Sequence, residues 1–142
     1  MTTRPRPVPD AITAFYWDAA ARGELAVLQC EVCGLAHSPP EVACPHCGAS
    51  ALAPQVVGGR GTVFASCVVR QAFDAAFIEA VPYVLVLVEL DDRPGVRVLT
   101  NLAGVGGDPA DVPEPVPVGT PVEVVFEPQD DWVLPQFRLA PA

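Results

Sequence analysis

The chain has 142 residues, 51% apolar and 18% charged, which excludes an intrinsically disordered protein. Its formal net charge is −9 and its eight basic residues are all arginines, so it lacks the basic stripe typical of nucleic-acid-binding proteins. No apolar run reaches the about 18 residues of a membrane span. Residues 1–10 lack the apolar core of a signal peptide. We therefore expect a cytoplasmic protein that keeps its thiols reduced and has neither a membrane nor nucleic acid as a partner.

The first predicted element is a helix over residues 10–22. Asp10 can cap its N-terminus, and Gly23 suits the position just past its end. Three neighbouring aromatic residues lie in this segment: Phe15, Tyr16 and Trp17. They either pack on the protein's own domain or anchor a protein partner, since aromatic residues are enriched at interface hot spots.

Two Cys-x-x-Cys pairs follow the helix, separated by ten residues and each followed by glycine. The four cysteines are Cys30, Cys33, Cys44 and Cys47. Zinc is held by four ligands in a tetrahedron, and two such turns supply them in pairs. The glycines permit a backbone conformation that a side chain would hinder. The sequence therefore predicts one structural zinc ion per chain, which folds a zinc ribbon.

Several alternatives for these cysteines remain open. Two redox dithiols are possible, although neither pair precedes a helical pattern as in thioredoxin-type motifs. Iron is a second candidate, because the knuckles resemble those of rubredoxin. His37 or His46 is a possible substitute ligand. Catalytic zinc is disfavoured, because four thiolates leave no open position for water.

The rest of the chain predicts a small β-barrel. Residues 51–61 are expected to form a connector with a glycine-rich turn around Arg60. Five apolar, β-branched runs then end at Gly, Pro or Asp: residues 62–70, 83–90, 96–102, 122–127 and 132–139. Five strands match an OB-fold, although another small barrel or a sandwich fits the pattern as well. Cys67 is predicted to pack in the core, and residues 103–117 to form an exposed loop.

Taken together, these segments resemble a family that joins a rubredoxin-like zinc ribbon to an OB-fold. The matching pieces are the aromatic helix with Gly-Glu-Leu at 15–25, LQCEVCG at 28–34, SPP at 38–40, CPHCG at 44–48, GRGTV at 59–63, VPY at 81–83, LTNL at 99–102 and LPQFR at 134–138. The resemblance implies a mainly β protein in three parts. These are an N-terminal arm and helix at 1–24, a zinc ribbon at 25–55 and a five-stranded OB-fold barrel at 56–142.

The resemblance also implies a function, that of a non-catalytic accessory subunit. Such a subunit binds a thiolase-like or lipid-transfer-type enzyme and supports its acyl-CoA substrate binding or channelling in lipid, steroid side-chain or aromatic-acid catabolism. The sequence shows no acid–base set of its own that would argue for catalysis. One alternative is a stand-alone CoA- or acyl-CoA-binding protein, in which Arg60 contacts a phosphate. Another is a single-stranded nucleic-acid-binding OB-fold, which the negative charge opposes.

Overall fold

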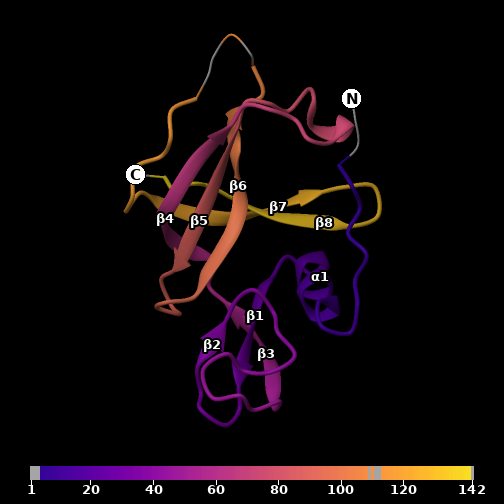
Figure 1. The fold of residues 1–142 in the computed structure, drawn as a ribbon, viewed down its shortest axis with the longest axis vertical. Helices are drawn as coiled ribbons and strands as arrows, with labels where there is room; N and C mark the ends of the chain where they lie inside the picture. The colour runs from indigo at the N-terminus through magenta and orange to yellow at the C-terminus, as the bar shows by residue number, and fades with distance from the viewer. Residues whose placement is uncertain (1–3, 109, 111–112, 142) are drawn as a thin grey trace.

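A small three-stranded sheet lies beneath a closed five-stranded barrel in the computed structural model, which describes residues 4–108, 110 and 113–141 (Figure 1). The small sheet has the strand order β2-β1-β3. Its strands are β1 (Leu25–Cys30), β2 (Ala36–His37) and β3 (Leu52–Val57). Helix α1 (Ala14–Ala21) lies beside this sheet and contacts both β1 and the barrel strand β8 (Figure 1). No helix that the structure describes is long and apolar enough to cross a membrane.

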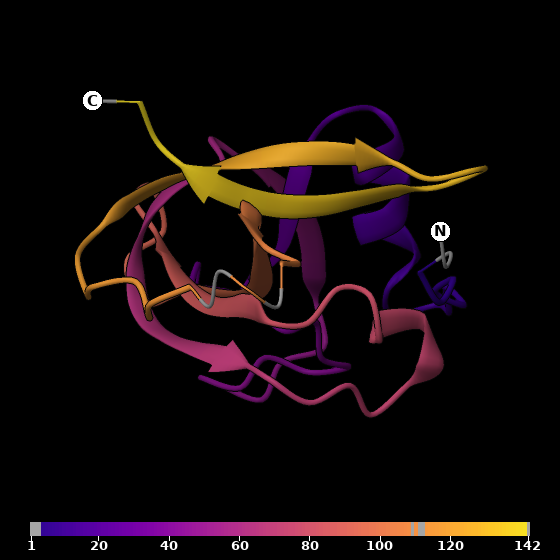
Figure 2. The ribbon, with the colours of Figure 1, turned by 90° about the horizontal axis from the view of Figure 1, so that it is seen from above.

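The barrel closes in the order β4-β5-β6-β8-β7. Its strands are β4 (Arg60–Val69), β5 (Tyr83–Leu90), β6 (Arg97–Gly106), β7 (Pro121–Pro128) and β8 (Val133–Leu139), with a short 3₁₀ helix η1 (Ala75–Phe77) between β4 and β5. Strand β4 pairs antiparallel with β7, whereas β6 meets β8 in parallel at Leu102 and Phe137. Figure 2 shows the β7–β8 hairpin along one side of the barrel. The predicted helix, zinc ribbon and five-stranded OB-fold are confirmed.

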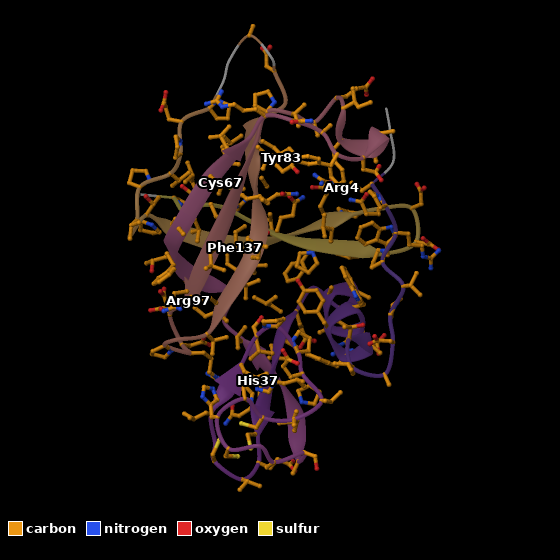
Figure 3. All side chains as sticks on the ribbon, in the orientation of Figure 1. Arg4, His37, Cys67, Tyr83, Arg97 and Phe137 are labelled. Atoms are coloured by element: carbon orange, nitrogen blue, oxygen red, sulfur yellow. The ribbon has the colours of Figure 1, made fainter. Side chains whose placement is uncertain are left out.

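The core runs from the barrel into the small sheet. Every second side chain of β5 is buried, as expected for strands with one face on the core: Val84, Val86, Val88 and Leu90. Phe137 of β8 lies at the centre of the barrel and is 1% exposed (Figure 3). Leu25, Val27 and Val57 of the small sheet belong to the same buried cluster. The ribbon is therefore fixed to the barrel by shared apolar packing.

The helix is shorter than the sequence predicts. It begins at Ala14 rather than at residue 10 and ends at Ala21. The Asp10 carboxylate does accept hydrogen bonds, from the backbone N–H groups of Ile12 and Thr13, each at 2.9 Å. These bonds stabilise a turn ahead of the helix, because an Asp side chain that binds nearby backbone N–H groups offers the backbone an alternative to helical hydrogen bonds. They also hold the pKa of Asp10 below its usual value, with the N–H of Thr13 as the largest cause.

The predicted connector at 51–61 was wrong, because most of it is β3. This strand pairs with β1 over its whole length, from Leu25 with Val57 to Cys30 with Leu52. Pro54 is tolerated there because β3 is an edge strand. The predicted division at 1–24, 25–55 and 56–142 stays a proposal, and its second boundary falls within β3. Residues 1–3 and 142 lie outside the described part.

Two further expectations for the barrel need correction. Strand β6 extends to Gly106, so residues 103–106 of the predicted loop are strand, while residues 109 and 111–112 of that loop lie outside the described residues. Cys67 was expected in the core and is instead exposed. A register shift between Val63 and Ala65 explains this, since one extra residue reverses which side chains face inward. Val63 and Val68 face the core as a result.

Candidate metal centre

The two cysteine pairs lie on two turns of the same shape. In the first, the Gly34 N–H donates to the Cys30 carbonyl at 2.9 Å, and in the second the Gly48 N–H donates to the Cys44 carbonyl at 2.9 Å. Both glycines have positive φ, +78° and +80°. Side chains are disfavoured in this backbone conformation, which explains the glycine after each pair.

The four sulfur atoms form one compact cluster. Cys30 Sγ lies 3.6 Å from Cys47 Sγ, and Cys33 Sγ lies 3.7 Å from Cys44 Sγ. All four lie within 4.8 Å of one another. A tetrahedral zinc ion with Zn–S bonds of about 2.3 Å requires sulfur separations of about 3.8 Å. A disulfide would need about 2.05 Å. The cluster therefore fits a single tetrahedral ion and excludes disulfides among these four residues in this state.

Backbone N–H groups lie close to two of the four sulfurs and favour the thiolate form of Cys30. Those of Val32 and Cys33 lie 3.4 and 3.5 Å from Cys30 Sγ, and that of His46 lies 3.4 Å from Cys44 Sγ. The N–H of Cys33 is the main cause that lowers the pKa of Cys30 to about 7. Four thiolates would saturate the ion, so the site can hold the ribbon together but offers no position for substrate.

Neither histidine belongs to the sulfur cluster. Within the described residues, the only group of metal-binding side chains consists of the four cysteines. His46 is exposed. His37, on β2, is buried, and neither of its ring nitrogens has a hydrogen-bond partner among the described residues. Desolvation is the main cause that lowers the pKa of His37, so its ring is neutral near neutral pH.

The aromatic residues of α1 pack partly on the protein itself. Tyr16 lies against the buried core, and its burial raises its pKa to about 12. Its ring contacts Trp17 edge-to-face at 5.0 Å between centroids, and Trp17 contacts Trp132 in the same way at 5.8 Å. Phe15 is half-buried. A partner-binding role for Phe15, Tyr16 and Trp17 stays a prediction.

Arg60 is the first residue of β4 and does not lie in a turn. It is exposed and lies opposite Glu123 in the β4–β7 ladder. An acidic neighbour weakens the case for a phosphate contact at this place. The predicted CoA contact of Arg60 remains untested.

Sequence reasoning missed a groove between α1, the ribbon and the barrel. Its volume is about 620 Å³. The aromatic residues of α1 line one part, His37 and the prolines that follow it line a second, and the β5–β6 end of the barrel lines a third. Nothing in the local sequence pattern signals it, because the three parts meet only through tertiary packing.

These observations define a protein that joins a structural zinc ribbon to an OB-fold barrel. Residues 17–53 match the ChsH2 rubredoxin-like zinc ribbon domain, and residues 54–127 match the ChsH2 C-terminal OB-fold domain. The chain belongs to this ChsH2 family, as the sequence resemblance implied. The family match and the sulfur geometry are consistent with one structural zinc ion per chain, as predicted.

Two curated relatives are similar over most of this chain. One is a probable enoyl-CoA hydratase alpha subunit of Thermomonospora curvata, 34% identical over 138 residues, which are 96% of this chain and 40% of the relative. The other is the 3-oxo-4,17-pregnadiene-20-carboxyl-CoA hydratase alpha subunit of Mycobacterium tuberculosis, 37% identical over 129 residues, which are 91% of this chain and 38% of the relative. The chain thus spans about 40% of the length of these relatives.

Two solved structures share the fold. A chain of the structure named Ltp2-ChsH2(DUF35) aldolase is 32% identical, with a TM-score of 0.76, over 96% of this chain and 100% of that chain. A DUF35-family protein of unknown function from Sulfolobus solfataricus is 12% identical, with a TM-score of 0.57, over 92% of this chain and 86% of its own. At that identity the second match is evidence for the fold alone.

Proposed function

We propose that this protein is a non-catalytic accessory subunit of a thiolase-like or lipid-transfer-type enzyme that acts on acyl-CoA substrates. The observation that carries the proposal is the match to a chain of the Ltp2-ChsH2(DUF35) aldolase. That match covers 96% of this chain and all of the other at 32% identity, so the whole unit corresponds and not one motif. The two CoA-thioester hydratase names among the relatives agree with an acyl-CoA substrate class.

The chemistry of the described residues supports a role without turnover. The cysteine cluster would be coordinatively closed when loaded. His37 has no carboxylate or nucleophile within hydrogen-bond reach among these residues, and general acid–base catalysis needs such a set. Cys67 is exposed and forms no disulfide within the described part of the chain. The relatives named as hydratase subunits are much longer, so their names do not assign hydratase activity to the unit present here.

Complex formation with a thiolase-like protein tests the proposal. We would co-express the chain with each thiolase-like protein encoded in the same genome and measure the mass of the product by size-exclusion chromatography with light scattering. A stable complex of both chains is expected. Separate elution of two folded proteins, at concentrations well above the micromolar range of weak interfaces, would contradict the proposal.

The aromatic helix is the proposed contact, and Phe15 allows the cleanest test. Tyr16 and Trp17 also stabilise the protein, whereas Phe15 makes no aromatic pair in the described structure. Phe15→Glu should weaken the complex and leave the melting temperature of the isolated protein unchanged. Val118→Glu is the control, because Val118 is an exposed apolar residue at 75% exposure that lies in the loop before β7. Equal weakening by both variants would argue against α1 as the contact.

A further inference from the structure

The groove beside α1 has the size and lining of a small-molecule site. Its volume of about 620 Å³ lies within the roughly 300–1,000 Å³ typical of ligand pockets. The aromatic side chains of α1 form one wall, and Val98 and Leu99 of β6 lie on another. Leu99 is 68% exposed, so an apolar surface is left uncovered at the rim. Figure 3 shows His37 within the ribbon below the barrel and Arg97 on the part of the barrel nearer the ribbon.

His37 lines this groove and lacks the hydrogen bonds that a buried imidazole needs. It is 6% exposed, and neither Nδ1 nor Nε2 finds a partner among the described residues. A neutral imidazole has one N–H donor and one acceptor nitrogen. Leaving such groups unsatisfied costs about 1–3 kcal/mol, and a buried polar group without a partner in a native fold calls for an explanation. Both nitrogens are closed off in this conformation, so a molecule in the groove supplies the missing partner only if the His37 side chain turns towards it.

The groove offers no unpaired charge to an ionic ligand. Among the residues that the structure describes, Arg97 is the one charged residue of the groove lining. The guanidinium lies 3.4 Å from the Glu89 carboxylate and stacks on the Phe64 ring, with its central carbon 3.7 Å from the ring centroid. Burying an anion or a cation without a partner is costly, so these contacts favour a neutral ligand.

We propose that this groove binds a neutral, mainly apolar small molecule that carries one hydroxyl or carbonyl group, and that His37 pairs with this polar group. The apolar body lies between the aromatic residues of α1 and the side chains of β6. This site is distinct from the cysteine cluster, and the proposal does not depend on a partner enzyme. A hydroxyl can pair with either ring nitrogen, whereas a carbonyl needs the N–H.

The test compares two apolar probes of similar size on the zinc-loaded full chain. 1-Naphthol has one hydroxyl, and 1-methylnaphthalene has none. Dissociation constants come from titrations followed by ¹H–¹⁵N NMR, which also reports the Trp17 indole and the His37 ring nitrogens. The variants are His37→Phe and Leu99→Glu. The control is Leu139→Glu, because Leu139 is also an exposed leucine, at 48%, but lies on β8 outside the groove lining.

Saturable binding of 1-naphthol to the wild-type chain is expected, with shifts at Trp17 and the His37 ring. The ratio of the 1-naphthol affinity to the 1-methylnaphthalene affinity should fall about five-fold in His37→Phe. This is the size of one net hydrogen bond. Leu99→Glu should weaken both probes about ten-fold, and Leu139→Glu neither. The proposal is overturned if the wild-type chain does not bind 1-naphthol saturably, if the shifts lie outside the groove, or if Leu99→Glu has no effect. Should His37→Phe fail to fold, an unchanged His37 ring signal in the saturated wild-type chain overturns it.

Discussion

The four cysteines of the ribbon differ in their surroundings. Cys30 and Cys44 are buried, whereas Cys33 and Cys47 lie at the surface. All four are needed to close a tetrahedral site, so loss of an exposed cysteine should be as damaging to the site as loss of a buried one. Metal binding and ribbon folding are therefore expected to be one event.

Replacing Cys33 tests this coupling. Cys33→Ala leaves three thiolates, and we expect zinc content to fall from about one ion per chain to near zero after dialysis against a mild chelator. The amides of the ribbon should lose their dispersed NMR signals while those of the barrel keep theirs. Cys67→Ala is the control, because exposed Cys67 lies on β4 far along the chain from the cluster, and it should retain full zinc. Iron in the purified protein, or full occupancy in Cys33→Ala, would contradict the assignment.

Position 61 requires glycine because neighbouring atoms leave no room for a side chain, not because its backbone conformation excludes one. A Cβ atom there would overlap the Glu89 carbonyl oxygen and a methyl group of Val88. Gly61→Ala should lower the free energy of unfolding by about 1–3 kcal/mol, because β4 and β5 would have to separate. Gly58→Ala is the matched control, since its nearest atom, Asp92 Oδ2, lies at 3.5 Å. Urea denaturation compares the two, and equal losses would show that the overlap is relieved without cost.

At the scale of residues, the sequence predicts what is local. The cysteine spacing and the following glycines specify the two turns because every contact needed lies within five residues, as the Gly34 to Cys30 hydrogen bond illustrates. Cys67 was wrongly predicted to be buried, because the register shift in β4 reverses which side chains of the strand face the core. No residue type in the sequence signals that shift. The burial of His37 was not predictable either, since it depends on how the ribbon packs against the barrel.

Helix α1 is held to the barrel by an aromatic pair. The Trp17 and Trp132 rings meet edge-to-face at 5.8 Å, which links the helix to the residue before β8. In a double-mutant cycle, Trp17→Ala and Trp132→Ala should couple by about 0.5–1.5 kcal/mol in unfolding free energy. Trp17→Ala and Leu139→Ala should add without coupling, because Leu139 is the last residue of β8, at the other end of the strand. No coupling in the first pair would show that the helix is held by other contacts.

At the scale of elements, the Gly, Pro and Asp residues at the ends of the apolar runs predicted most strand ends of the barrel well. Strand β5 has the predicted bounds, β7 is one residue longer than predicted at each end, and β8 is one residue shorter at its start. Strand β3 was missed because Pro54 and an irregular pattern argue against a strand in isolation. It forms because β1 offers a complete row of backbone partners. The pairing partner, which the local sequence does not reveal, decided the structure there.

Across the whole molecule, the ribbon and the barrel form a unit whose two parts share some of their buried residues. Leu25, Val27 and Val57 of the small sheet belong to the same buried cluster as the barrel core, and Tyr16 of the helix packs against it. Such a unit can wall off or position a substrate for a neighbouring enzyme without reacting with it, since orientation alone accounts for much of a rate enhancement. The negative charge of −9 agrees with a protein partner better than with nucleic acid.

Acyl-CoA turnover, measured for this chain alone, for the thiolase-like partner alone and for both together, tests the accessory role most directly. The account predicts no turnover by this chain, low turnover or weak substrate binding by the partner alone, and full activity for the complex. Activity of the mixture should fall with Phe15→Glu and be preserved in Val118→Glu, whose side chain is exposed in the loop before β7. Turnover of acyl-CoA by this chain alone, or full activity of the partner without it, would contradict the account.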